Sequence, residues 1–292
     1  MKKVTIAIIP AAGLGTRMLP ASKAIPKEML PIVDKPAIQY IVEEAVEAGI
    51  KDILIITNRG KGAMEDHFDH NFELEYNLRQ KGKDDILKEL EGVAKLANIT
   101  FLRQKETGGL GDAVYKAKTF VGDEPFAVLY GDDVIIGEKP AIGEMLEAFE
   151  QSGGEGGVVG VKEVAAEQIV KYCTLDVTPL ENGVMKVNDM IEKPKPEQIM
   201  SLYAILGRCI LQPEIFDVLE KTPKGAGGEL QLTDAMATLA REGKMYAIEY
   251  SGTRYDMGNK LGFLIANIEH GLNHPEICDE FKEYLKEIVK TF

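Results

Sequence analysis

Short, continuously apolar runs alternate with amphipathic helical stretches along this chain, and few folds accommodate that pattern. Residues 4–9 form a β-branched run that ends in Pro10 and a small-residue turn at 11–15. A stretch with helical periodicity follows at 37–48, and the next apolar run comes directly after it at 52–57. Continuous apolar strands separated by amphipathic helices predict a parallel sheet that is covered by helices on both faces.

The rest of the chain continues this alternation. Residues 61–98 are charged and helical without a strand signal, which predicts a helical excursion at the edge of the sheet. From 172 to 211 the strand signals are denser and the turns shorter, which predicts a mixed β extension. Further strands are predicted at 99–102, 126–130 and 158–161, and further helices at 142–149, 213–219, 230–240, 260–272 and 276–290. The expected fold is α/β, a doubly wound, mostly parallel, Rossmann-like mixed sheet with a β extension and C-terminal helices.

The charge and the cysteines limit the classes of function. The 34 Lys and Arg residues against 47 Asp and Glu leave a formal net charge of −13. An acidic chain does not hold nucleic acid by bulk electrostatics, so no nucleic-acid partner is expected, and any anionic ligand must meet a few placed cations. No apolar run approaches the ~18 residues of a membrane span, so no membrane partner is expected either. The cysteines Cys173, Cys209 and Cys278 lie far apart without a C-x-x-C motif, which indicates reduced thiols in a cytoplasmic protein.

The turn after the first predicted strand carries the strongest chemical signal. Its small residues would let backbone N–H groups approach a phosphate chain closely; they are Ala11, Ala12, Gly13 and Gly15. Arg17 adds a fork of donors for phosphate oxygens, and Lys27 adds a compact cation. The alternative is a glycine turn with two surface cations. The chain has no P-loop motif, and Met18 stands where an NAD-binding fingerprint needs its third glycine, so both of those nucleotide-binding classes are excluded.

Further sequence blocks follow this turn in a fixed order over nearly the whole chain. Together they resemble the sugar-nucleotide pyrophosphorylase family, and most closely the bacterial UTP–glucose-1-phosphate uridylyltransferases (UDP-glucose pyrophosphorylases). The blocks are G-x-G-T-R-x-x-P at 13–20, P-K-E-M-L-P at 26–31, Arg103-Gln104, Gly109-Leu110-Gly111, Gly131-Asp132-Asp133, Glu192-Lys193-Pro194, the run 228–234, and Tyr255-Asp256-Met257-Gly258.

The resemblance implies an enzyme that converts UTP and glucose 1-phosphate to UDP-glucose and pyrophosphate. It also implies Mg²⁺ as cofactor and a homo-oligomer, a dimer or larger. The chain is then one nucleotidyltransferase domain, 1–292, with a nucleotide-binding half at 1–150, a sugar-phosphate-binding half at 151–270 and a C-terminal helix at 271–292. That helix either packs back on the body or makes a dimer contact. Two alternatives stay open: a related enzyme that uses dTTP or another sugar, and a non-catalytic ligand-binding paralog.

Two polyanions must meet in such a reaction, so positioning and charge neutralisation do most of the catalysis. The resemblance implies that Arg17 and Lys27 hold the departing phosphates and that Lys193 meets the sugar phosphate. Asp132 follows a predicted strand at the ligand-binding edge of the sheet, where a carboxylate suits Mg²⁺. Asp256 is the second implied metal ligand, brought from a distant loop.

The resemblance also assigns the groups that read the sugar and the base. Glu192 is expected to accept hydrogen bonds from glucose hydroxyls, and Asp133 to reach the sugar as well. Gln104 and Gly109 are expected to recognise uracil, through the side-chain amide and through close approach of the backbone.

Two positions depart from the family pattern. Asp112 stands where the family usually has His; it is either a favourable first-turn residue of a helix or a carboxylate that repels the triphosphate and changes nucleotide affinity or base preference. Tyr172-Cys173 replaces the usual Tyr-Gly of the sugar-contacting strand. Cys173 can supply the same backbone contact to the sugar only if its φ is negative.

Overall fold

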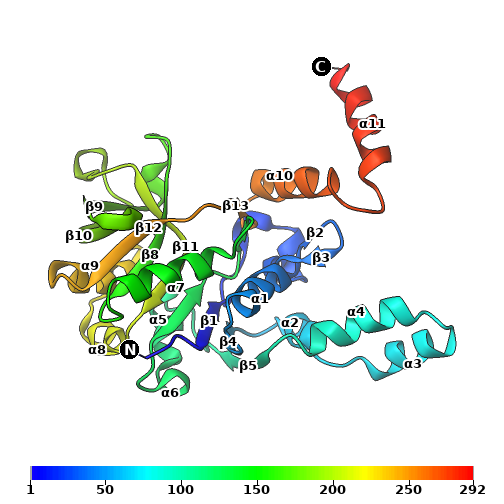
Figure 1. The fold of residues 1–292 in the computed structure, drawn as a ribbon, viewed down its shortest axis with the longest axis horizontal. Coiled ribbons are helices and arrows are strands. Elements are labelled where there is room, and N and C mark those ends of the chain that lie inside the picture. The colour runs from blue at the N-terminus through cyan, green and yellow to red at the C-terminus, as the bar shows by residue number, and fades with distance from the viewer. Residues whose placement is uncertain (1, 292) are drawn as a thin grey trace.

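The computed structural model describes residues 2–291, and its centre is a nine-stranded sheet in the order β5-β4-β1-β6-β11-β8-β12-β10-β9 (Figure 1). Its strands are β1 (Ile6–Pro10), β4 (Asp52–Thr57), β5 (Asn98–Arg103), β6 (Phe126–Leu129), β8 (Gly157–Glu163), β9 (Cys173–Pro179), β10 (Val184–Glu192), β11 (Tyr203–Leu211) and β12 (Met245–Glu249). Two small sheets pair β2 (Pro31–Ile32) with β3 (Lys35–Pro36), and β7 (Asp133–Ile136) with β13 (Thr253–Asp256).

The helices follow the strands closely in sequence. They are α1 (Ala37–Glu47), α2 (Gly62–Phe68), α3 (Phe72–Gln80), α4 (Asp84–Ala94), α5 (Leu110–Lys116), α6 (Lys118–Val121), α7 (Ala141–Gln151), α8 (Glu214–Lys221), α9 (Leu232–Arg241), α10 (Lys260–Gly271) and α11 (Cys278–Val289). No helix in the part of the chain that the structure describes is long and apolar enough to cross a membrane.

The sheet is parallel at one end and mixed at the other. Strands β5, β4, β1 and β6 run parallel to one another. Strand β11 is antiparallel to both of its neighbours, β6 and β8. Beyond it, β12 is parallel to β8, and β10 is antiparallel to β12 and β9. The predicted mostly parallel arrangement therefore holds for the first half of the sheet and not for the second.

Helices cover both faces of the sheet, as the alternation of strands and helices predicts. The core on one face includes residues of α5, α6, α8 and α9, and the core on the other includes residues of α1, α2, α7 and α10. Strand β1 shows the two-residue period directly, because Ile8 packs into the first core while Ala7 and Ile9 pack into the second. Each face thus buries one set of alternating side chains.

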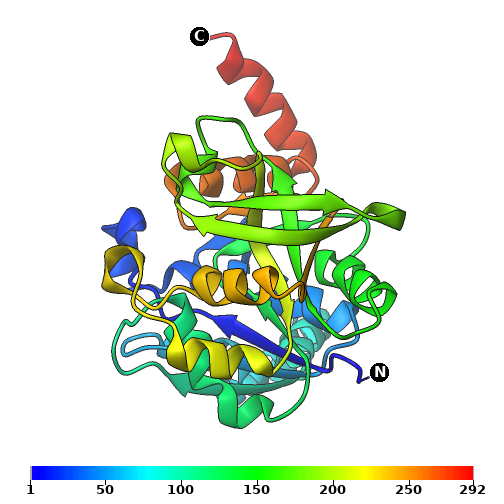
Figure 2. The same cartoon turned by 90° about the vertical axis from the view of Figure 1, so that its left-hand side faces the viewer.

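The helical excursion is confirmed. Helices α2, α3 and α4 occupy the segment without strand signals, and α3 and α4 extend away from the body beyond β4 and β5 (Figure 1). The C-terminal helix was expected either to pack back on the body or to make a dimer contact. In Figures 1 and 2, α11 stands away from the body, and it contains no buried residue. In the single chain this helix therefore does not pack along the body, although the Phe281 ring lies against Gly271 of α10.

Candidate active site

The predicted phosphate-binding turn leaves the end of β1 in a conformation that requires glycine. Gly15 has φ +67°, in the left-handed region that side chains disfavour. Its carbonyl accepts a hydrogen bond of 2.7 Å from the Ser22 hydroxyl. The short helix Thr16–Met18 begins directly after it and carries Arg17. The glycine thus fixes where the guanidinium leaves the turn.

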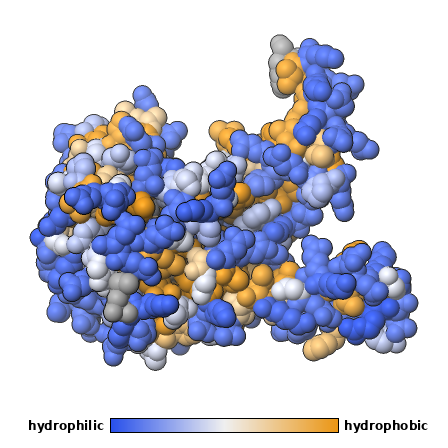
Figure 3. All heavy atoms as spheres, viewed as in Figure 1, coloured by the Kyte–Doolittle hydropathy of each residue, from blue (hydrophilic) through white to orange (hydrophobic). Residues whose placement is uncertain are grey.

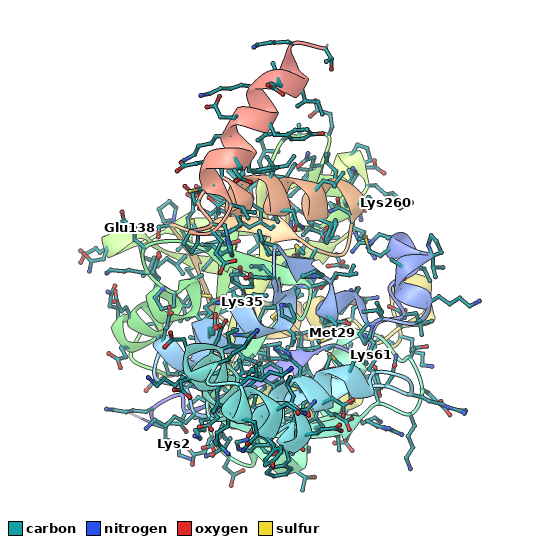
Figure 4. The ribbon with its side chains drawn as sticks, turned by 90° about the vertical axis from the view of Figure 1, so that its right-hand side faces the viewer. Lys2, Met29, Lys35, Lys61, Glu138 and Lys260 are labelled. Carbon is teal, nitrogen blue, oxygen red and sulfur yellow. The ribbon has the colours of Figure 1, made fainter. Side chains whose placement is uncertain are left out.

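A buried ion pair supports this turn from beneath. Lys61 Nζ lies 2.8 Å from both carboxylate oxygens of Glu28 and also donates to the Ala11 carbonyl. Glu28 is 1% exposed and Lys61 6%. Burial raises the pKa of Glu28 and lowers the pKa of Lys61, and each shift is opposed by the attraction of the partner. Figure 4 shows Lys61 next to Met29, which belongs to the short helix Lys27–Met29. Glu28 lies in the same helix, so the Lys61–Glu28 pair connects the turn to the helix that carries Lys27.

The first cavity, of about 400 Å³, opens at this turn. Five of the predicted site residues line it, namely Ala12, Gly13, Lys27, Gln104 and Gly109. Two other predicted turn residues support the cavity rather than line it: Ala11 is buried against Lys61, and Gly15 closes the turn.

A second cavity, of about 430 Å³, lies beside the first and gathers residues from distant parts of the chain. Eight predicted site residues line it: Arg17, Asp132, Asp133, Tyr172, Cys173, Glu192, Lys193 and Asp256. Sequence reasoning did not assign Tyr130, Lys171 or Arg254 to the site, although each also lines this cavity.

A salt bridge between Lys27 and Asp132 joins the two cavities. Arg17 Nη2 lies 3.8 Å from Asp132 Oδ2, and Arg17 Nη1 lies 3.5 Å from Asp256 Oδ2. Burial disfavours the charge of Asp132, but Lys27 and Arg17 outweigh burial and hold the pKa of this carboxyl below its usual value. Lys27 thus contacts one predicted metal ligand, Asp132, and Arg17 contacts both.

The two aspartates face a common space that Gly258 keeps open. A Cβ atom at Gly258 would lie 2.6 Å from both Asp132 Oδ2 and Arg17 Nη2, and 2.9 Å from Asp256 Oδ1. Carboxylate oxygens around such a space are the donors that a hard divalent cation prefers. Within residues 2–291 no group of three or more His, Cys, Asp and Glu side chains is placed to hold a metal, so a cation here would take its other ligands from phosphate or water.

Asp133 is held by an arginine that the sequence did not single out. Arg254 Nε and Nη2 lie 2.9 and 2.5 Å from Asp133 Oδ1, and Nη1 donates to the Tyr172 hydroxyl at 3.3 Å. Burial raises the pKa of Asp133 to about 6 despite the opposing charge of Arg254. The available signal was position, because Arg254 precedes Asp256 by two residues in strand β13, and alternate residues of a strand share a face.

The residues predicted to read the sugar lie on or next to the paired strands β9 and β10. Glu192 pairs with Cys173 across the ladder, and its Oε2 accepts a 3.0 Å hydrogen bond from the Thr233 hydroxyl. Burial raises the pKa of Glu192, opposed by Thr233 and Lys193. The backbone N–H of Lys193 donates to the Tyr172 carbonyl at 2.8 Å. Cys173 lies in regular strand geometry outside the left-handed region, so it meets the condition set for replacing glycine.

Asp112 lies in the first turn of α5, as one of its two interpretations predicts. Its Oδ2 accepts a 2.6 Å hydrogen bond from Gln104 Nε2, and its Oδ1 lies 3.2 Å from Lys116 Nζ. It lines a third cavity, whereas its partner Gln104 lines the first.

Comparisons with known proteins agree with this arrangement. A family model described as nucleotidyl transferase matches residues 6–270. The UTP–glucose-1-phosphate uridylyltransferase YngB of Bacillus subtilis (strain 168) is 53% identical over 289 residues, which covers 99% of this chain and 97% of that protein. UTP–glucose-1-phosphate uridylyltransferase 2 of Staphylococcus saprophyticus is 51% identical over 288 residues, 99% of each chain. A solved structure of UTP-bound UGPase from Acinetobacter baumannii superimposes with a TM-score of 0.89 at 39% identity, covering 97% of this chain and 99% of that one. A UDP-glucose pyrophosphorylase complexed with UDP-glucose gives a TM-score of 0.84 at 39% identity, covering 91% and 98%.

Proposed function

Because this chain belongs to the nucleotidyl transferase family, we propose that it is a UTP–glucose-1-phosphate uridylyltransferase, which transfers a uridylyl group to glucose 1-phosphate and releases pyrophosphate. The observation that carries the proposal is the Lys27–Asp132 salt bridge, because it joins a cavity at a phosphate-binding turn to a cavity with sugar-reading groups. In the reaction an oxygen of the sugar phosphate bonds to the α-phosphorus of UTP. The bond from that phosphorus to the bridging oxygen breaks, and its electron pair leaves with pyrophosphate.

The nucleotide occupies the first cavity in this proposal. Backbone N–H groups of the turn approach the phosphates, and Arg17 and Lys27 neutralise the departing pyrophosphate. Lys61 and Glu28 fix the turn and the position of Lys27 through their ion pair. Gln104 and Gly109, at the other end of the cavity, read the uracil.

Glucose 1-phosphate occupies the second cavity. Lys193 holds its phosphate, and Glu192, oriented by Thr233, accepts hydrogen bonds from glucose hydroxyls. Tyr172 and Cys173 line the same wall. Asp133 acts mainly through Arg254, which its carboxylate holds against Tyr172. Two phosphates held at adjoining cavities give the proximity on which phosphoryl-group transfer depends.

Nucleotidyltransferases of this family generally use a divalent metal, and we propose Mg²⁺ for this chain. Asp132 and Asp256 would hold it at the space beside Gly258. When bound it neutralises phosphate charge that Arg17, Lys27 and Lys193 leave unmatched.

We also propose four broader features. The strand order β5-β4-β1-β6, all parallel, supports a Rossmann-like, doubly wound nucleotide half. The single sheet that runs through both halves supports one domain over 1–292, with the halves 1–150 and 151–270 and the C-terminal helix 271–292. The exposed apolar side chains of α10 support a homo-oligomer. The three free cysteines support a cytoplasmic location.

The test measures pyrophosphate release by the purified protein with Mg²⁺, glucose 1-phosphate and either UTP or dTTP. We expect turnover with UTP, and we expect Asp132→Ala to abolish it while far-UV circular dichroism stays unchanged. Faster turnover with dTTP would indicate a thymidylyltransferase. No turnover with any common nucleoside triphosphate would indicate a non-catalytic paralog.

A further inference from the structure

Asp112 is an acidic residue near the site to which the proposed chemistry assigns no role. It does not line the nucleotide cavity. Gln104 lines that cavity, while Asp112 lines the neighbouring cavity. The side chain of Gln104 therefore stands between the proposed base site on one side and Asp112 on the other.

The contacts of Gln104 fix which way its amide points. Its Nε2 donates to Asp112 Oδ2 at 2.6 Å and to the Gly109 carbonyl at 3.3 Å. A carboxylate and a backbone carbonyl are both acceptors only, so neither tolerates the amide oxygen in place of the NH₂ group. Gln104 is buried, and a flipped amide would leave three acceptors facing one another. The amide oxygen Oε1 must therefore be the atom presented to the nucleotide cavity.

We infer that Asp112 is a positioning residue for base specificity: it holds Gln104 so that Oε1 faces the base and accepts only from a base with an N3–H donor. Uracil and thymine have that donor, whereas N3 of cytosine is an acceptor and would meet Oε1 acceptor to acceptor. This inference rests on the proposed function and on Gln104 as the base-reading residue. The orientation of Gln104 would discriminate against CTP. It would not discriminate between UTP and dTTP, which other contacts must do.

Two neighbours hold Asp112 in this position. Lys116, one helical turn later, lies 3.2 Å from Oδ1, so the two oxygens of Asp112 have different partners. Gly108 makes room for the carboxylate, because a Cβ at that position would lie 2.8 Å from Asp112 Cγ. The ammonium group of Lys116 is a donor only, and this determines what an amide in place of Asp112 would do.

Asp112→Asn should reverse the amide of Gln104. Lys116 would take the Asn oxygen, which leaves the Asn NH₂ group facing Gln104. Gln104 would then turn Oε1 toward that group and present its own NH₂ to the base, because the 2.6 Å contact at residue 112 outweighs the longer 3.3 Å contact to the Gly109 carbonyl, which the flip gives up. In the wild type the unmatched contact is between Oε1 and N3 of cytosine; in the variant it is between the Gln104 NH₂ group and N3–H of uracil. We therefore expect the ratio of kcat/KM for UTP to kcat/KM for CTP to fall by about tenfold or more.

The cycle of variants separates this role from a structural one. Lys116→Met leaves a carboxylate that is still only an acceptor, so the UTP preference should stay as in the wild type. The double variant Asp112→Asn with Lys116→Met frees the Asn to present its oxygen to Gln104, so most of the UTP preference should return. Glu106→Gln removes a carboxylate from the same cavity wall without touching Gln104, and it should not change the ratio.

Steady-state kinetics with UTP and CTP measure the ratio for each variant, and thermal melting measures its stability. If Asp112→Asn turns over UTP with an unchanged UTP-to-CTP ratio, or if the double variant falls as far as the single one, the inference is overturned. Absence of any turnover in the wild-type protein would instead overturn the proposed function, so the two failures are distinguishable. An equal loss for both triphosphates, with a lowered melting temperature, would assign Asp112 to stability and also overturn the inference.

Discussion

Glu192 and Lys193 are consecutive, yet both side chains line the same cavity. Successive residues of a strand point to opposite faces, so this arrangement needs a break in strand geometry. The break is at Lys193, whose φ of 47° lies in the left-handed region. Its N–H to the Tyr172 carbonyl holds that conformation. Backbone strain of this kind is stored where it serves a site, and here it brings an acid and a cation to one cavity.

The raised pKa of Glu192 predicts a pH dependence for sugar binding. A raised pKa means that the carboxylate loses its charge at a pH above the ordinary value of 4.5, so it accepts hydrogen bonds less well as the pH falls. We expect the KM for glucose 1-phosphate to be lower in the wild type than in Glu192→Gln. This difference should be largest near about pH 8 and should shrink toward about pH 5. The ratio of the two KM values cancels the titration of the substrate itself.

Thr233 provides the control for this measurement. Its hydroxyl lowers the pKa of Glu192, so Thr233→Val should move the loss of the wild-type advantage to higher pH. A KM ratio that does not change with pH would contradict the assignment of Glu192 to the sugar.

Residue roles were predictable where a motif carried them and not where only packing did. Asp132 and Asp256 stand in recognisable blocks, and the structure brings them together beside Gly258. Lys61 and Arg254 act through buried partners that lie far away in the sequence, so no local pattern reveals them. Only the fold places those partners.

At the scale of elements, one ion pair ties helix α1 to the middle of the sheet. Arg208 of β11 is fully buried, and its Nε and Nη2 lie 3.0 and 2.6 Å from the two oxygens of Glu44. Glu44 also accepts a 3.0 Å hydrogen bond from the Ile142 N–H at the start of α7. The pair therefore connects α1, α7 and the antiparallel strand at which the sheet changes direction.

Removing one charge of this pair should be costly. Glu44→Gln leaves a buried guanidinium without its counter-charge, and we expect the free energy of unfolding to fall by about 3–5 kcal/mol. Glu43→Gln, next to it in α1, weakens partly exposed contacts to Lys35 and Gln39 and should cost less than about 1 kcal/mol. Urea unfolding followed by far-UV circular dichroism measures both, since the chain has no tryptophan. Equal losses in the two variants would contradict the assignment.

The elements that periodicity predicts well are the long ones that serve packing. Strand β4 (Asp52–Thr57) and helix α1 (Ala37–Glu47) match their predicted positions closely because each presents an uninterrupted apolar set to the core. Strand β13 was not predicted, because two of its four residues, Arg254 and Asp256, serve the site and break the apolar pattern. Strand β12 continues the sheet after α9 and was also missed.

At the scale of the whole molecule, the C-terminal helices leave apolar surface exposed. Leu261 and Leu264 of α10 are 67% and 55% exposed. Ile277, directly before α11, and Tyr284, within α11, are exposed as well. Figure 3 shows apolar atoms along one side of α11 and near its junction with α10. A helix that stands away from its own body with such a surface suits a second copy of the chain.

We therefore expect the protein to be larger in solution than its monomer mass of 32.1 kDa. Leu264→Glu should shift the equilibrium toward the monomer, as measured by size-exclusion chromatography with light scattering. Leu180→Glu is the matched control, because Leu180 is similarly exposed at the far hairpin between β9 and β10. A monomeric wild-type protein, or an equal effect of both variants, would contradict the oligomer.

The contacts of Lys27 and Arg17 have a thermodynamic consequence. Without ligand, the cations proposed to bind phosphate and the carboxylates proposed to bind metal neutralise each other. A triphosphate arriving alone must compete with Asp132 and Asp256 for its cations, and a divalent ion arriving alone must compete with Lys27 and Arg17. Each ligand would release the side chains that the other needs, so we expect their binding to be cooperative and the coupling to be reciprocal. A metal–nucleotide complex would replace both halves of these ion pairs in one binding step. We therefore expect the site to bind the complex more tightly than either the metal ion or the nucleotide alone.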